Sequence, residues 1–198
     1  MAQSNAMSTK RDKVSIQLPL GGHSFSTEGR EALRGADVVA LLPTPRTTLV
    51  PSEALNVADL ASHLAAVGLA PRIGQLAVAT EAVDGMVAVM AVDETCDAAL
   101  RTVAHSLVYS SPLNRAVDVK RGVVLSLIEG VLYVRIFNDG LQLAEAMEAV
   151  TEADIYYYLE MLNRVYHIYN ISAYVAGGSV TLMNVCKRLF NEVKQCEL

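Results

Sequence analysis

Three glycine-rich segments carry the residues of this chain whose type and spacing could do chemistry. Gly21-Gly22 and Glu129-Gly130 each follow a strand-like apolar run, and Gly177-Gly178 lies between a predicted strand and a predicted helix. A glycine turn at a helix N-terminus presents backbone N–H groups and a positive dipole, which together can hold an anion such as phosphate. The same glycines also suit ordinary hairpins and loops. The residues leave both interpretations open.

The acidic residues that metal-assisted phosphoryl chemistry requires are scarce in these turns. Such chemistry needs carboxylates that converge on the bound anion. The second turn has Glu129 as its nearest acid, and the first turn has none. Asp139, in the later Asn138-Asp139-Gly140 segment, is the other acid that such chemistry could use. The chain also lacks a Walker-type loop, a nucleophile elbow, a His-Glu-x-x-His pattern and any Cys/His spacing for a metal. We therefore predict no catalytic residues and no metal ligands.

A tyrosine-rich segment offers a different kind of site in a chain without tryptophan. The apolar positions with helical spacing, which should face a sheet, are Ile155, Tyr158, Leu159, Leu162 and Val165. Tyr156 and Tyr157 fall on the flank of that stripe, and Tyr166 follows it. Tyrosine is a frequent anchor of protein interfaces. We predict that Tyr156, Tyr157 and Tyr166 bind a protein partner or a second copy of the chain.

Composition limits the class of protein. The chain has 198 residues, 52% of them hydrophobic, which suffices for one large or two small cores. Its net charge of −5 argues against a nucleic-acid partner. No apolar stretch approaches the roughly 18 residues of a membrane span. The odd number of widely spaced cysteines, Cys96, Cys186 and Cys196, indicates a reducing cytoplasm, with Cys186 in a core.

Strand and helix patterns divide the chain into two α/β halves. Residues 1–12 are expected to be a disordered leader, of which Met1 to Ala6 precede a second methionine and resemble an expression leader. The linker candidate is Ser110 to Asn114, so we expect domains at 13–114 and 115–198. The first half is predicted to contain strands at 14–20, 37–42, 47–50, 76–80 and 86–92, a strand returning from Gly21-Gly22 through Ser24 to Ser26, and helices from Ser52 to Gly68 and from Thr95 to Val108. The second is predicted to contain strands at 123–128, 131–137, 141–147 and 171–175, a helix capped by Thr151 and Asp154, and a helix from Ser179 through Val193.

This order resembles the two-lobed actin-like ATPase architecture, the ribonuclease-H-like fold of actin, sugar kinases and the Hsp70 chaperones. More narrowly, the chain looks like a family of uncharacterised bacterial proteins predicted to have this fold. The segments that carry the resemblance are the opening strand into Gly-Gly, Thr48 to Pro51, Asn138 to Gly140, and Asp154 to Leu159. The resemblance implies mixed sheets that each open with an antiparallel hairpin and are flanked by helices. It also implies that Gly21, Gly22, Glu129 and Gly130 approach nucleotide phosphates and that Gly177 and Gly178 lie beside adenosine, with ATP and Mg as the cofactors if that cleft works.

One departure from the ATPase pattern decides which function we expect. Active members carry an aspartate at the start of the first phosphate turn, and aligning the Gly-Gly pairs puts Pro19 there. Proline has neither charge nor N–H donor. We therefore expect a noncatalytic interaction or assembly module with degenerate nucleotide-binding turns and no intrinsic ATP hydrolysis. The alternatives are an ATPase or kinase-like enzyme using Glu129 or Asp139, and a sensor that binds a small molecule or nucleotide without turnover.

Overall fold

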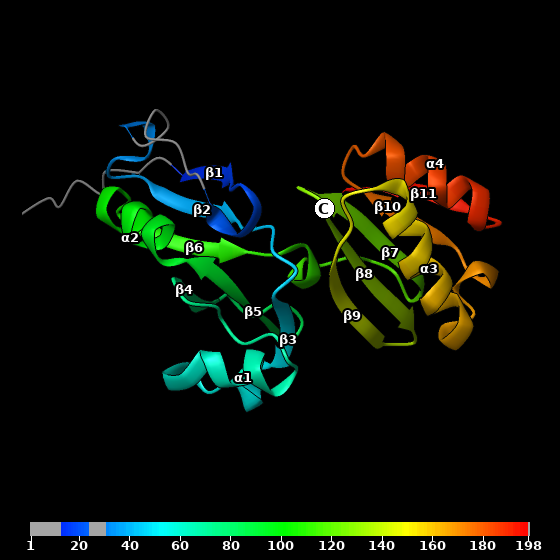
Figure 1. The fold of residues 1–198 in the computed structure, drawn as a ribbon, viewed down its shortest axis with the longest axis horizontal. Helices are drawn as coiled ribbons and strands as arrows, with labels where there is room; N and C mark the ends of the chain where they lie inside the picture. The colour runs from blue at the N-terminus through cyan, green and yellow to red at the C-terminus, as the bar shows by residue number, and fades with distance from the viewer. Residues whose placement is uncertain (1–12, 24–30, 198) are drawn as a thin grey trace, which may run out of the picture.

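The computed structural model describes residues 13–23 and 31–197. The predicted leader 1–12 and the predicted returning strand Ser24 to Ser26 fall outside these ranges. Figure 1 shows the described elements gathered in two groups beside each other. The first runs from β1 (Lys13–Gln17) to β6 (Ser106–Ser110), and the second from β7 (Arg121–Ile128) to β11 (Val193–Cys196).

The second group is built on a five-stranded mixed sheet with the strand order β11-β10-β7-β8-β9. β7, β8 (Val131–Asn138) and β9 (Leu141–Glu148) form an antiparallel meander, whereas β10 (Ala173–Ala176) pairs in parallel with β7 and β11. Glu129 and Gly130 adopt the left-handed φ values of 50° and 72° that a two-residue hairpin needs. The predicted meander is confirmed. The last helix was predicted to run through Val193, but Val193 begins β11, and Val193 to Cys196 pair in parallel with β10.

Two helices cover one face of this sheet. They are α3 (Glu152–Tyr166) and α4 (Val180–Leu189), and Figure 1 shows both on the same side. The predicted capping box of Thr151 and Asp154 is present, and Ser179 caps α4. Val165 was predicted to face the core but is 68% exposed. Ten residues at about 100° each turn Val165 roughly 80° away from the buried Ile155, so the assumed stripe drifts off the core.

The first group contains two three-stranded sheets. One is all parallel, with the order β1-β2-β6, where β2 is Asp37–Leu41. The other is antiparallel, with the order β3-β5-β4, formed by Thr47–Pro51, Met86–Asp93 and Gln75–Ala79. Gly21 and Gly22 both have left-handed φ values, 63° and 82°, as the predicted turn requires, and β1 pairs in parallel with β2. Within residues 13–23 and 31–197, the expected opening antiparallel hairpin is that of β7 and β8 in the second half.

The helices of the first group are shorter than the sequence predicts. α1 (Leu60–Ala66) begins after Asp59, whose side chain accepts from Ser62 N, so Ser52 is not its cap. α2 (Glu94–Val103) ends before β6, whose residues Ser106 to Val108 were predicted as part of the same helix. Leu107 and Tyr109 alternate into the core from β6, a pattern that supports a strand. Short 3-10 helices occur at Leu20–Gly22, Glu31–Leu33, Ser52–Ala54, Val57–Asp59, Pro112–Asn114 and Ile168–Asn170.

The first part of the connection between the two groups, Ser111 to Asn114, is buried. Leu113 lies in a buried cluster with Val131 and Tyr133 of β8, and Leu20 and Leu49 of the first group pack against it. The Tyr133 hydroxyl accepts a hydrogen bond from Thr44 N at 2.9 Å. The predicted linker thus fills the space between the five-stranded sheet and the first group. No helix within the described ranges is long and apolar enough to cross a membrane.

Candidate functional site

The first glycine turn uses its backbone donors within the protein. Gly21 N donates to Pro43 O at 2.7 Å, Gly22 N to Pro19 O at 2.9 Å, and His23 N to Leu20 O at 3.2 Å. A side chain on Gly22 would meet Cys96 Sγ at 3.1 Å, so this residue packs tightly on the start of α2. The turn therefore faces α2 with its amides already satisfied.

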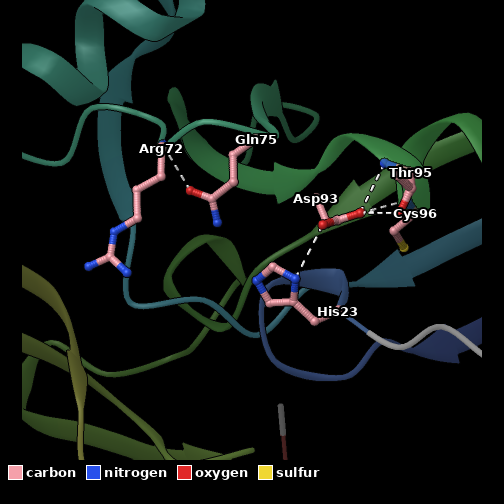
Figure 2. A network of polar contacts seen from close by, with 6 residues as sticks. All are labelled: His23, Arg72, Gln75, Asp93, Thr95 and Cys96. Atoms are coloured by element: carbon pink, nitrogen blue, oxygen red, sulfur yellow. Dashed lines mark hydrogen bonds and ion pairs between the residues drawn. The ribbon is translucent and has the colours of Figure 1, made fainter.

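A polar network fixes the turn to α2, as Figure 2 shows. His23 Nδ1 lies 3.2 Å from Asp93 Oδ2, and Asp93 Oδ1 accepts from Thr95 N and Cys96 N as the N-cap of α2. The hydrogen bond from the Thr95 hydroxyl, with those from the backbone, lowers the pKa of Asp93. The carboxylate of Asp93 is thereby committed to capping, which gives the network a structural role.

The second turn lies against the end of β1. Glu129 Oε1 accepts from Gln17 Nε2 at 3.2 Å, two residues before Pro19. Gly130 O accepts from Ala149 N at 2.7 Å, which ties the turn to the segment before α3. The structure thus brings Glu129 near the first turn, with its carboxylate bound to an amide group.

The third turn lies at the same end of the five-stranded sheet as Glu129. Ala176 pairs in parallel with Ser126, so Gly177 follows β10 where β7 runs into its hairpin. Gly177 has a left-handed φ of 77°, whereas Gly178 does not, and a side chain at Gly178 would meet open space. Ser179 directly follows Gly178 and caps α4.

This difference predicts unequal effects of substitution in the third turn. Gly177→Val should lower the free energy of unfolding by about 1 kcal/mol, because a β-branched residue is strained at positive φ. Gly178→Val should change it by less than about 0.5 kcal/mol, as exposed substitutions usually do. Urea denaturation followed by circular dichroism measures both. Equal effects would show that the backbone at Gly177 is not the constraint.

Two cavities border the connection between the groups, and neither is lined by the six predicted cleft residues. The first has a volume of about 640 Å³ and lies over the face of the parallel sheet that carries Asp37, Val39, Ser106 and Ser110. The second has a volume of about 570 Å³ and includes Arg135 and Asp139. Over residues 13–23 and 31–197, no group of three or more His, Cys, Asp or Glu side chains gathers as metal ligands.

The predicted partner-binding tyrosines separate into two environments. Tyr157 is 66% exposed and Tyr166 is 38% exposed. Tyr156 is half-buried, and its hydroxyl accepts from Arg188 Nη1 of α4 at 3.1 Å, so its predicted contact with a partner stays a prediction. The sequence prediction missed Met161 and Val165, which are exposed on α3 four and eight residues after Tyr157. That spacing was the available signal, because residues four apart share a helix face.

Comparison with known proteins gives a structural likeness only. No family model matches the chain, and no curated protein matches it. A crystal structure from Bacteroides thetaiotaomicron, of a protein with an actin-like ATPase fold and unknown function, superposes with a TM-score of 0.66 at 15% identity, over 81% of this chain and 68% of that one. The cytoplasmic domain of EpsL, an inner membrane component of the type II secretion system of Vibrio cholerae, matches with a TM-score of 0.43 at 12% identity, over 85% and 68%. The first of these likenesses shows that this chain has the actin-like ATPase fold.

Proposed function

We propose that this protein is a noncatalytic interaction module with an actin-like ATPase fold. The observation that carries the proposal is the first glycine turn, whose three N–H groups donate to Pro43, Pro19 and Leu20. A phosphate site needs such donors free to point at the anion. These residues do not fit a nucleotide phosphate, since Pro19 adds no charge and Gly22 packs on α2.

The surface that we propose for interaction is the outer stripe, defined as Tyr157, Met161 and Val165 of α3. Their exposed fractions are 66%, 43% and 68%. Large apolar side chains that gather on one helix face of a folded protein mark contact surfaces. Tyr166 lies at the end of the same helix and is exposed beside them.

We propose a second copy of the chain as the occupant of the outer stripe. Tyr157 and Val165 stand four residues on either side of Met161. Two antiparallel copies of α3 crossing at Met161 would place each Tyr157 against Val165 of the other copy. A two-fold interface requires this kind of self-complementary patch.

The proposal includes the arrangement of the chain and its compartment. We assign residues 13–114 and 115–198 to two lobes that meet at the buried connection around Leu113. Cys186 and Cys196 are free thiols, which supports a reducing compartment such as the cytoplasm. Self-association would then occur between copies that share this compartment.

Self-association through the outer stripe is testable by sedimentation velocity over a concentration series. We expect the wild type to dimerise with a dissociation constant below about 100 µM, and Tyr157→Ser with Val165→Ser to weaken it at least about tenfold. The matched control is Val67→Ser with Ile73→Ser, two exposed apolar residues away from α3. A wild type that stays monomeric, or a control pair as damaging as the stripe pair, would exclude the stripe as a self-association surface.

The noncatalytic assignment has its own measurement. ATP with Mg²⁺ should neither be hydrolysed nor raise the melting temperature, because a ligand stabilises only a folded state that binds it. Turnover that Glu129→Gln abolishes would establish the ATPase alternative. A melting-temperature rise without turnover would establish the sensor alternative.

A further inference from the structure

The cavity of about 570 Å³ contains features that interaction through α3 does not use. It lies between the β4–β5 turn, the connection that follows Leu113, and the β8–β9 turn. Its volume is within the roughly 300–1,000 Å³ of small-molecule sites. Most of its walls are apolar, and those residues are Leu49, Val83, Met86, Leu113, Val117, Val119, Phe137 and Leu141.

A buried arginine lines this cavity. Arg135 is 5% exposed and lies on the same face of β8 as Tyr133, away from α3. Its Nη1 donates to Arg115 O, while its buried Nη2 has no hydrogen-bond partner among the described residues. Buried polar groups are nearly always hydrogen-bonded, since an unsatisfied donor is unfavourable. The guanidinium of a residue that lines the cavity therefore has one buried donor without an acceptor.

The charges around the cavity favour an anion. Arg115, Lys120 and Arg135 line it together with Asp84 and Asp139, an excess of one positive charge in a chain whose net charge is −5. No described carboxylate lies within ion-pair distance of Arg135. Burial lowers the pKa of Arg135 to about 10, so the guanidinium still carries its charge at neutral pH.

We propose that this cavity binds a small organic carboxylate that pairs with the buried guanidinium of Arg135. The apolar part of the ligand would pack against Leu113, Val117 and Phe137. A charge-assisted hydrogen bond of this kind satisfies the donor and compensates the buried charge. Inorganic phosphate fits less well, because its several oxygens need several donors and Nη1 is already bound to Arg115 O.

Hexanoate is the probe, and hexanol is its uncharged match. Titration of the isotope-labelled protein should shift the backbone amide signals of Val119, Phe137 and Gly140 with hexanoate at millimolar concentration. Hexanol should shift them at least about tenfold less, since it lacks the charge that Arg135 recognises. Inorganic phosphate is run as a third titrant.

Two variants test the role of the arginine. Arg135→Met should weaken hexanoate binding at least about tenfold through loss of the charged donor, while Arg135→Lys retains part of it. Leu141→Trp keeps Arg135 and should weaken binding by filling the cavity from its partly exposed rim. If Arg135→Met does not fold, Leu141→Trp still tests whether hexanoate binds in this cavity. Neither change touches the outer stripe, so sedimentation of the same variants separates this proposal from the proposed function.

Four results would overturn the proposal. They are the absence of shifts up to about 20 mM hexanoate, equal response to hexanol, hexanoate binding that survives Arg135→Met, and shifts produced by phosphate but not by hexanoate. Selective hexanoate binding that both Arg135→Met and Leu141→Trp weaken would establish the site.

Discussion

Tyr133→Ala is expected to lower the free energy of unfolding by about 3–5 kcal/mol, the range measured for large aromatic residues removed from cores. Tyr133 is 2% exposed and packs with Leu113 and Val131 in the cluster that joins the connection to the five-stranded sheet. Its removal would leave a cavity at the place where the two groups of elements meet. Urea denaturation followed by far-UV circular dichroism measures the loss.

Tyr133→Phe isolates the hydroxyl from the ring. Thr44 is 2% exposed, and its N–H donates to the Tyr133 hydroxyl at 2.9 Å. Removing the acceptor leaves a buried donor unsatisfied, which should cost about 1–3 kcal/mol. The control is Tyr157→Phe, where the ring is exposed and the change should stay within about 0.5 kcal/mol. A wild-type midpoint for Tyr133→Phe would contradict a stabilising role for this bond.

The dependence of stability on alkaline pH is a second test of Tyr133. Burial raises the pKa of the Tyr133 hydroxyl above its ordinary value of 10.0. The unfolded chain therefore releases this proton at a lower pH than the folded chain does. Stability from this group is complete below pH 10 and falls as the pH rises above it. Tyr133→Phe should remove this contribution to the alkaline slope.

The elements that were predictable from sequence depend on local signals. The capping box of Thr151 and Asp154 and the turn at Glu129-Gly130 are set by residues a few positions apart. The meander of β7, β8 and β9 follows from such turns and from alternating apolar residues, so its strands could be placed. The order of the second half was accordingly recovered, apart from β11.

The elements that were missed depend on distant partners. β6 and β11 are short segments that become strands only beside β2 and β10. β1 was expected to pair with a nearby returning strand, yet its partner in the described residues is β2, in parallel. A local pattern cannot specify such pairing, because strand propensity depends strongly on tertiary context.

The candidate sites were likewise predictable where they depend on local sequence and not where they depend on distant contacts. The three glycine turns were identifiable, but the sequence could not show that Gly21 N donates to Pro43 O. Arg135 left a signal that was not used, a lone charge inside the apolar run from Val131 to Phe137. Charged residues are almost never fully buried unless paired, so its position in a buried strand already indicated a special environment.

Arg135→Met should therefore stabilise the ligand-free protein, by about 2 kcal/mol. Burial lowers the pKa of Arg135 to about 10, and at 1.36 kcal/mol per pKa unit a shift of this size disfavours the charged form in the folded state by about 3 kcal/mol. Methionine fills similar space without a charge, although losing the bond to Arg115 O costs about 1 kcal/mol. Replacing buried charges with apolar residues is stabilising in comparable cases.

The measurement is again urea denaturation, with Arg121→Met as the matched control. Arg121 is exposed at the start of β7, so its substitution should change stability by less than about 0.5 kcal/mol. Arg135→Lys keeps the charge and should not stabilise. A loss of stability in Arg135→Met would mean that the guanidinium already has the compensation it needs within the folded chain. A gain in stability would mean that the wild type retains a destabilising buried charge. Hexanoate should then raise the melting temperature of the wild type but not that of Arg135→Met, because only the wild type has a charge for the ligand to compensate.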